Sequence, residues 1–303
     1  MKILVTGGAG FIGSNIVDKY VKLGHNVVIV DDLSNGKKEH INPKAKFYKL
    51  DIREDGLERI FKAERPDIVN HHAAQIDVRK SVEDPKLDAS INIGGMINIG
   101  RNCIKYGVKK LIFASSGGAI YGETKSPAKE DAVVRPISPY AINKYTAELY
   151  LQYWKEAYGL NYTLLRYSNV YGPRQAGGEA GVISIFIQNM RANKPITIYG
   201  NGKQIRDYVY VGDVASANVS ALTKGNGSTY NIGTKEGTSV NELFKELCKL
   251  TGYNKTPRYA PPRQGEVFRS ILNAEKAKKE LGITPIPLKE GLNRTVQWFK
   301  EQS

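Results

Sequence analysis

The first strand-like segment of the chain runs directly into a glycine-rich turn, and this arrangement restricts the fold more than any other feature. Residues 2–6 read KILVT, and residues 6–14 read TGGAGFIGS. Gly7, Gly10 and Gly13 are three residues apart, and apolar residues then recur at helical spacing. A strand, turn and helix of this kind lets the backbone approach a pyrophosphate, with the N–H groups of the helix N-terminus directed at the phosphates. We therefore expect a dinucleotide site here, the alternative being a glycine-rich turn without a ligand.

The rest of the first half alternates between apolar strands and helices. Further strands are expected near 26–32, 46–51, 66–72, 109–115 and 161–169, with long helices near 87–106 and 140–158. Unbroken Val, Ile and Leu runs are typical of parallel strands that are buried on both faces. The expected fold class is therefore α/β, a doubly wound parallel sheet with a smaller α/β substrate-binding domain. We expect 1–170 and 212–236 to form the dinucleotide-binding domain, and 171–211 and 237–303 the smaller one.

Polar residues stand where the expected parallel strands end, which is where open α/β sheets bind ligands. Asp31 follows Gly13 by 18 residues and ends the second strand, where its carboxylate would accept hydrogen bonds from a ribose and repel a 2′-phosphate. This favours NAD over NADP. Asp51 ends the third strand. The fourth ends in His71 and His72, which point to opposite faces of a strand and cannot readily chelate one ion, so we expect no metal site.

The composition restricts the remaining classes of function. The net charge is +14, but Lys and Arg are spread along the whole chain, which argues against a nucleic-acid-binding protein and suits an anionic small substrate. No window resembles a membrane helix or a signal peptide, so a cytoplasmic protein is expected. The two cysteines are far apart and fit neither a disulfide framework nor a zinc site.

The segment SPYAINKYT, at 138–146, contains the two residues that are best suited to catalysis. Tyr140 and Lys144 are four residues apart and therefore share one helix face. A nearby cation favours a phenolate, so we expect Lys144 to lower the pKa of Tyr140 from about 10 toward about 7, with help from a positive nicotinamide ring. Tyr140 could then take a proton from a substrate hydroxyl while the carbon that bears it gives hydride to the cofactor. The alternative is an ordinary surface pair.

Taken together, these motifs resemble an extended short-chain dehydrogenase/reductase of the NAD-dependent epimerase/dehydratase family. The resemblance rests on TGGAGFIGS, the two strand-end aspartates, HHAAQ, FASSGGAIYGE and SPYAINKYTAELY. The later segments LRYSNVYGPRQ, ITIYGNGKQIRDYVYVGDVA and PPRQGEVFRSILNAEKAKKELG are similar to the nucleotide-sugar branch, closest to UDP-glucose (UDP-galactose) 4-epimerases. The resemblance covers essentially the whole chain and implies a Rossmann sheet.

The resemblance also implies roles for individual residues. Lys144 would hold the nicotinamide ribose, and Ser116, with Ser115 as the alternative, would hydrogen-bond the reacting oxygen beside Tyr140. The cofactor site is expected to comprise Gly7, Gly10, Phe11, Ile12, Gly13, Asp31, Asp32, Ser34, Asn35, Gly36, Asp51, Ile52, Ala73, Ala74, Gln75, Asn92, Ser115, Tyr140, Lys144 and Tyr167. The substrate site is expected to comprise Ser116, Tyr140, Asn169, Val182, Thr197, Tyr199, Arg206, Arg263, Glu266 and Ser270.

The activity so implied is epimerisation at C4 of UDP-glucose or UDP-galactose through a 4-keto sugar. Alternatives are a 4-epimerase of UDP-glucuronate or of a UDP-N-acetylhexosamine, a nucleotide-sugar 4,6-dehydratase, and a catalytically silent NAD-binding sensor. Gly117 and Gly118 stand where family dehydratases place an Asp-Glu pair, which argues against a dehydratase. Small Ser270 is expected to open the pocket to a C2 N-acetyl group. A homodimer is expected, through 87–106 and 140–158, whose apolar residues beyond the catalytic turn are Leu149, Tyr150, Tyr153 and Trp154.

Overall fold

A seven-stranded parallel sheet forms the centre of the protein in the computed structural model, which describes residues 1–124, 126–175, 181–262 and 267–302. Its strand order is β11-β6-β5-β4-β1-β2-β3, and every neighbouring pair is parallel. The strands are β1 (Lys2–Thr6), β2 (Asn26–Asp31), β3 (Lys46–Lys49), β4 (Ile68–His71), β5 (Lys110–Ser116), β6 (Asn161–Tyr167) and β11 (Ser228–Ile232). The expected α/β class with a doubly wound parallel sheet is thus confirmed.

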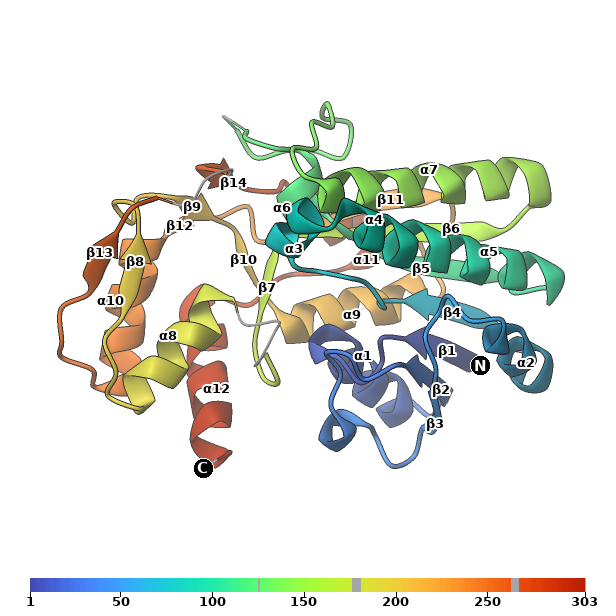
Figure 1. The fold of residues 1–303 in the computed structure, drawn as a ribbon, viewed down its shortest axis with the longest axis horizontal. Helices are drawn as coiled ribbons and strands as arrows, with labels where there is room; N and C mark the ends of the chain where they lie inside the picture. Colours follow the sequence, from blue (N-terminus) through green and yellow to red (C-terminus); the bar gives the residue numbers. More distant parts are fainter. Residues whose placement is uncertain (125, 176–180, 263–266, 303) are drawn as a thin grey trace.

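Helices cover both faces of this sheet, as Figure 1 shows. One face carries α1 (Phe11–Lys22), α9 (Val211–Ala221) and α11 (Glu275–Leu281). The other carries α2 (Gly56–Glu64), α5 (Gly95–Lys105) and α7 (Pro139–Tyr158). The interiors of β1 and β2 are fully buried between these layers, which explains their unbroken apolar sequences, whereas the edge strand β3 is only partly buried.

The helix expected over 87–106 is built from three consecutive pieces. They are α4 (Pro85–Ala89), a π-helical turn (Ser90–Gly94) and α5. The helical path begins two residues earlier than expected, because the Asp84 side chain caps it by accepting from the N–H of Leu87 and Pro85 occupies its first turn. Helix α3 (Val78–Glu83) precedes it, and the short α6 (Gly117–Ile120) follows β5.

A second group of elements packs around a core of its own, separate from the sheet (Figure 1). Its helices are α8 (Val182–Arg191), α10 (Val240–Thr251) and α12 (Leu288–Glu301). Three small sheets accompany them, β7 (Asn169–Tyr171) with β10 (Tyr208–Tyr210), β8 (Thr197–Tyr199) with β13 (Arg258–Ala260), and β9 (Ile205–Arg206) between β12 (Thr238–Ser239) and β14 (Arg269–Ser270). A 3-10 turn at Lys38–His40 completes the described elements. The chain therefore returns to the central sheet at α9 and β11 before it completes this second unit.

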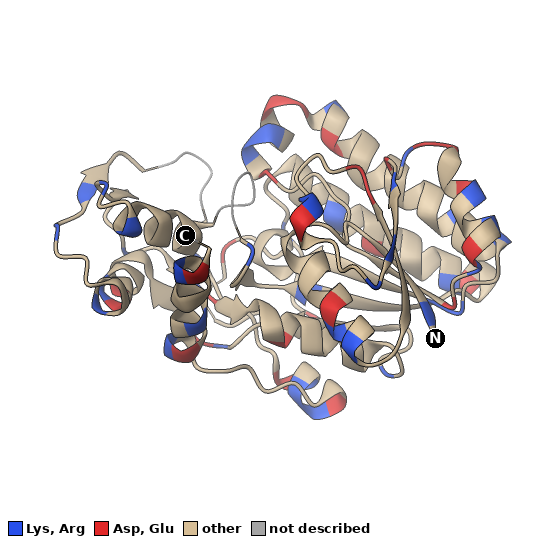
Figure 2. Ribbon diagram, turned by 90° about the horizontal axis from the view of Figure 1, so that it is seen from below, with Lys and Arg blue, Asp and Glu red and all other residues tan. Residues whose placement is uncertain are grey.

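Charged residues are distributed over both units. Figure 2 shows Lys and Arg interspersed with Asp and Glu along the visible helices, with no basic face in that view. Among the described helices, none combines the length and the apolar character that a bilayer crossing needs.

Candidate active site

The turn between β1 and α1 brings the backbone unusually close to the end of β4. Gly7 has a φ of +68°, and a Cβ atom placed there would lie 2.6 Å from the backbone nitrogen of Ala73. Gly10 caps α1 in an extended conformation without a side-chain hydrogen bond, so the first turn of the helix faces a cavity with its backbone groups. The lining of this cavity includes Phe11, Ile12 and Gly13. These are the features that a pyrophosphate site requires.

Asp31 is held in place at the end of β2 by the same turn. Its carboxylate accepts hydrogen bonds from the backbone N–H groups of Ala9, at 3.0 Å, and Leu33, at 2.9 Å. Burial raises the pKa of Asp31, and these two hydrogen bonds act in the opposite direction. The side chain is therefore rigidly oriented toward the cavity beside Gly36, of about 370 Å³, whose walls also contain Asp32, Ser34, Asn35, Asp51, Ile52, Ala73, Ala74 and Gln75.

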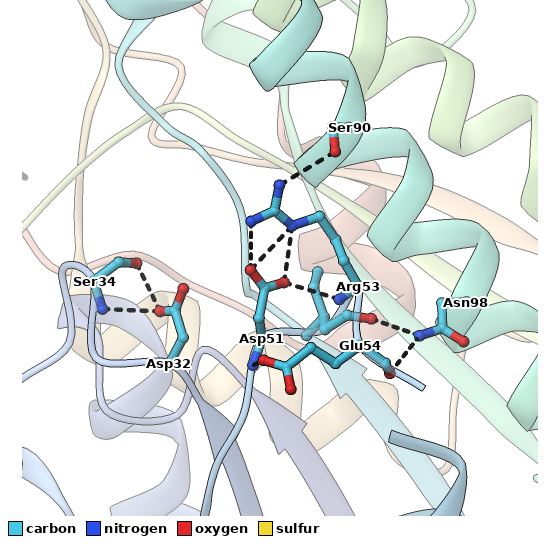
Figure 3. Close-up of polar contacts among 8 residues, drawn as sticks. Asp32, Ser34, Asp51, Arg53, Glu54, Ser90 and Asn98 are labelled. Carbon is cyan, nitrogen blue, oxygen red and sulfur yellow. Dashed lines mark hydrogen bonds and ion pairs between the residues drawn. The ribbon is translucent and has the colours of Figure 1, made fainter. Parts of the chain in front are cut away.

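The outer end of this cavity carries a hydrogen-bonded cluster that the sequence did not reveal (Figure 3). The Arg53 Nε donates to both carboxylate oxygens of Asp51 at 3.0 Å, and its Nη1 reaches the Ser90 hydroxyl at 3.2 Å. The hydrogen bonds from Arg53 lower the pKa of Asp51. Asp32 accepts from both the backbone and the hydroxyl of Ser34. Arg53 thus spans the rim from the end of β3 to the π-helical turn.

Tyr140, Lys144 and Ser116 meet in a cavity of about 210 Å³ next to the glycine turn. Helix α7 places Tyr140 in its first turn, where the phenol lies close enough to the Ser116 side chain for Ser116 to lower its pKa. The Lys144 ammonium donates to the carbonyl of Ala114 at 3.0 Å and lies 5.9 Å from the centre of the Tyr140 ring. Ser115 instead donates to the carboxylate of Glu148 at 2.5 Å. Of the two candidate serines, Ser116 is the one beside the phenol.

The charge states of this pair depart from the sequence expectation. Burial raises the pKa of Tyr140 to about 12, opposed by the Ser116 hydrogen bond and reinforced by the charge of Asp88. Burial also lowers the pKa of Lys144 to about 8, opposed by the negative charges of Asp88 and Glu148. Among the protein groups, therefore, the pKa of Tyr140 is raised and not lowered toward about 7 as the sequence predicts, because burial disfavours the phenolate and is the largest cause of the shift.

A third cavity, of about 410 Å³, extends from the catalytic cavity into the second unit, and Val170 and Gln175 line both. Asn169, Val182, Thr197, Tyr199 and Arg206 lie in its walls, as the sequence predicted for the substrate site. Arg263 and Glu266 lie outside the described residues. The structure thus gathers five of the predicted substrate residues around one cavity that opens toward Tyr140.

Of three further predicted site residues, two do not line the cavities described above and one does. Ser270 is 5 % exposed, donates to the carbonyl of Gly118 and lines none of the three cavities described above. Asn92 is buried and makes two hydrogen bonds to the backbone of Gln75, so it supports the cofactor cavity without lining it. Tyr167 lines the catalytic cavity, and its hydroxyl contacts Nε2 of His72.

Gln175 and Ser168 are further candidates that sequence reasoning missed. Gln175 is 6 % exposed and Ser168 is 9 % exposed, and both line the catalytic cavity. Neither the Gln175 Oε1 nor the Ser168 Oγ has a hydrogen-bond partner among the described residues. The signal in the sequence was their place in the motif LRYSNVYGPRQ, directly after the strand that ends at Tyr167. Over the described ranges, no group of acidic, Cys and His side chains is arranged to hold a metal ion.

The comparisons with known proteins agree with this geometry. The model of the NAD dependent epimerase/dehydratase family matches residues 3–233. A putative UDP-glucose 4-epimerase of Methanocaldococcus jannaschii is 50% identical over 304 residues, which cover 99% of both chains.

Two solved structures are similar over the full chain. The Thermotoga maritima UDP-glucose 4-epimerase with UDP-glucose has a TM-score of 0.98 and 51% identity, with 100% of this chain and 99% of that chain covered. The Thermus thermophilus UDP-glucose 4-epimerase in complex with NAD has a TM-score of 0.95 and 43% identity, with both chains fully covered. The glycine turn, the oriented strand-end aspartate and these matches together show that the chain belongs to the NAD-dependent epimerase/dehydratase family.

Proposed function

We propose that this protein is an NAD-dependent epimerase acting at C4 of a UDP-sugar, with UDP-glucose and UDP-galactose as its substrates. The observation that carries the proposal is the position of the Ser116, Tyr140 and Lys144 cluster. Its cavity shares walls with the cavity beside Asp31 on one side and with the cavity around Arg206 on the other. This arrangement would hold the reacting carbon of a sugar next to the cofactor while the nucleotide of the substrate occupies the cavity around Arg206.

The residues around the glycine turn fit NAD. Any side chain at Gly7 or Gly13 would fill the space next to the turn, and Asp31 is held where it can accept hydrogen bonds from a ribose. We assign the pyrophosphate to Gly10, Phe11 and Ile12, and the adenine end to Asp51 and Ile52. When bound, NAD accepts a hydride from the sugar and returns it.

The protein groups then manage the proton. Tyr140 takes the proton from the sugar hydroxyl at C4 and gives it back after the sugar has turned its other face, while Ser116 orients the oxygen. Lys144 holds the nicotinamide ribose and provides positive charge beside the phenol. Because burial raises the pKa of Tyr140 to about 12, formation of the phenolate depends on the positive charge of the bound nicotinamide ring and on the Ser116 side chain.

The second unit, expected at 171–211 and 237–303 but without α11, which packs on the central sheet, is assigned to the nucleotide of the substrate. Arg206 and Asn169 would meet the diphosphate, and Thr197 and Tyr199 the uracil, because arginine donors suit phosphate oxygens and the edge of a short strand offers backbone groups to a base. By the family resemblance, Arg263 would also bind the diphosphate, and Glu266 would bind a ribose hydroxyl. Ser270 at the C2 position of the sugar remains a prediction, and so does acceptance of N-acetyl sugars.

A dehydratase receives less support. The Cβ atom of a side chain at Gly117 would lie 2.6 Å from a methyl group of Leu272, so this position has no room for a larger residue without repacking. Gly118 has no group that can transfer a proton. The second candidate function is therefore a 4-epimerase of UDP-glucuronate or of a UDP-N-acetylhexosamine.

We further propose a homodimer that packs through α7 and α5, and a cytoplasmic location. Leu149 and Tyr153 on α7 are 46 % and 52 % exposed, which leaves apolar surface for a second copy. Trp154 does not take part, because it is 4 % exposed and packs against Gly100 in the core. A monomer by light scattering at micromolar concentration would rule the dimer out.

The decisive experiment is an assay of the purified protein with UDP-galactose, with UDP-glucose as the measured product. Interconversion in both directions is expected, and Tyr140→Phe should abolish it. Conversion of UDP-glucuronate alone would select the second candidate. Accumulation of a 4-keto-6-deoxy sugar from any nucleotide hexose would contradict both.

A further inference from the structure

Asp88 on α4 is a buried carboxylate that forms hydrogen bonds but no salt bridge among the residues that the structure describes. It is 1 % exposed. Its Oδ1 accepts from Gln75 Nε2 at 2.7 Å and from Asn92 Nδ2 at 3.0 Å, and its Oδ2 accepts from Asn143 Nδ2 at 2.6 Å. All three partners donate, which is the pattern expected around an ionised carboxylate. A negative charge at this depth needs such donors, since burial otherwise strongly disfavours the charged form.

The three partners come from the three segments that surround the reaction centre. Gln75 lies in the loop after β4 that lines the cofactor cavity. Asn92 belongs to the π-helical turn and also makes both hydrogen bonds to the backbone of Gln75. Asn143 lies on α7 directly before Lys144 and three residues after Tyr140. Asp88 is thus the common anchor of the cofactor loop and the catalytic helix.

The charged surroundings of the catalytic pair are few. From α7 itself, Glu148 also raises the pKa of Lys144, although it is paired with Arg166 at 2.6 Å, and it is not among the charges that act on Tyr140. From β5 come the Ser116 hydroxyl at Tyr140 and the Ala114 carbonyl at Lys144. At the end of β4, Lys144 lowers the pKa of His71 and of His72, in both cases after burial as the larger cause.

Helix α3, which packs on α7, carries Arg79, Lys80 and Glu83, all exposed, and Asp77 caps it. This leaves Asp88 as the buried charge that acts on both members of the catalytic pair. Its charge raises the pKa of Lys144 against burial, and it raises the pKa of Tyr140 together with burial.

We propose that Asp88 is a positioning residue of the epimerase reaction, whose buried negative charge keeps Lys144 cationic at the cofactor while its hydrogen bonds hold the Tyr140 helix on the cofactor loop. The inference rests on the function proposed above. Lys144 can lose its proton slightly above neutral pH, since burial lowers its pKa to about 8 even with Asp88 present. A neutral residue at this position would let Lys144 lose its proton at a lower pH.

The test compares Asp88→Asn with the exchange variant Asp88→Asn/Asn143→Asp. In Asp88→Asn, the new amide nitrogen can donate to Oδ1 of Asn143 after the Asn143 amide flips. The side-chain shape and the three hydrogen bonds are therefore preserved, and only the charge is lost. In the exchange variant the amide at position 88 accepts from Gln75 and Asn92 and donates to the new carboxylate at position 143, which returns a negative charge to the same hydrogen bond. Asp84→Asn, on an exposed carboxylate that caps the same helix, is the matched control.

Two readouts are followed from pH 6 to pH 10, namely the dissociation constant of NAD and kcat with UDP-galactose. In Asp88→Asn, the pH at which NAD binding weakens and both limbs of the kcat profile should move down by about one pH unit. The exchange variant should restore both to within a few tenths of a unit, and Asp84→Asn should leave them unchanged.

Other outcomes overturn the inference. A uniform loss of kcat or of NAD affinity at every pH, with unmoved midpoints, would mean that Asp88 only supports the fold. Wild-type profiles in Asp88→Asn would exclude any role. If the protein epimerises no UDP-sugar, the proposed function fails, but the pH dependence of NAD binding still decides whether Asp88 controls Lys144.

Discussion

Gly13 packs so closely against Gly7 that a Cβ atom on Gly13 would overlap the carbonyl oxygen of Gly7. This contact joins the first turn of α1 to the end of β1 and sets the distance at which the backbone can approach a pyrophosphate. The structure therefore requires glycine at position 13, one of the glycines that the sequence motif places there.

Gly13→Ala should therefore impair both folding and cofactor binding. The added methyl group meets backbone atoms that cannot move away, and overpacking of this kind costs about 1–3 kcal/mol of unfolding free energy. Urea unfolding and NAD titration measure the two effects. Gly94→Ala is the control, because Gly94 has helical φ and ψ and a Cβ there meets nothing within 4 Å, so a gain of up to about 1 kcal/mol is expected. Wild-type stability and NAD affinity in Gly13→Ala would contradict the assignment.

Tyr140→Phe should lower kcat by at least about 100-fold, the range associated with loss of a general acid–base group, while NAD affinity stays within a few-fold. The change removes the hydroxyl that contacts Ser116 and keeps the ring and its packing. Steady-state assays and NAD titration are the measurements. Tyr158→Phe alters an exposed tyrosine at the far end of the same helix and should be silent. Activity of Tyr140→Phe within tenfold of wild type would exclude Tyr140 as the proton acceptor.

The buried ion pair between Glu148 and Arg166 should be the most sensitive polar contact of the core. Glu148 is 0 % and Arg166 5 % exposed, and the pair is bidentate, with Ser115 and Tyr121 as further partners. Arg166→Met leaves a buried carboxylate without its cation and should cost about 3–5 kcal/mol of unfolding free energy. In Glu148→Leu/Arg166→Met both charges are gone, so urea unfolding should show a clearly smaller loss. A double variant less stable than the single one would refute this explanation.

Glu64 should make stability depend on pH on the acid side. Hydrogen bonds from Lys46 first, and from Tyr48, lower the pKa of Glu64 to about 2, below its ordinary value of 4.5. The folded state therefore gains stability from the ionised carboxylate above pH 4.5 and loses it as the pH falls from 4.5 toward 2.

The stability advantage of wild type over Glu64→Gln, measured by urea unfolding, should accordingly shrink across this interval. Glu236→Gln removes an exposed carboxylate and serves as the control. A constant difference between wild type and Glu64→Gln from about pH 7 to pH 3 would show that Glu64 contributes no pH-dependent stability.

The sequence by itself determined the features that depend on neighbours along the chain. Strand and helix periods predicted the parallel sheet, and the turn residues marked its nucleotide end, because hydrophobic spacing and backbone freedom are local properties. Because Tyr140 and Lys144 are four residues apart on a helix, they are expected to share one helix face, and the structure places both in one cavity.

Only the tertiary structure decided what depends on burial and on segments far apart in the chain. It showed that Ser115 donates to Glu148, which leaves Ser116 as the serine beside the phenol. It also showed that Trp154 is buried in the core. The structure further showed Asp88 to be a buried carboxylate bonded to the catalytic helix, and burial to be the largest influence on the pKa of Tyr140. Desolvation and Coulomb interactions depend on the atoms that surround a group in space, and a spacing along the chain carries no information about them.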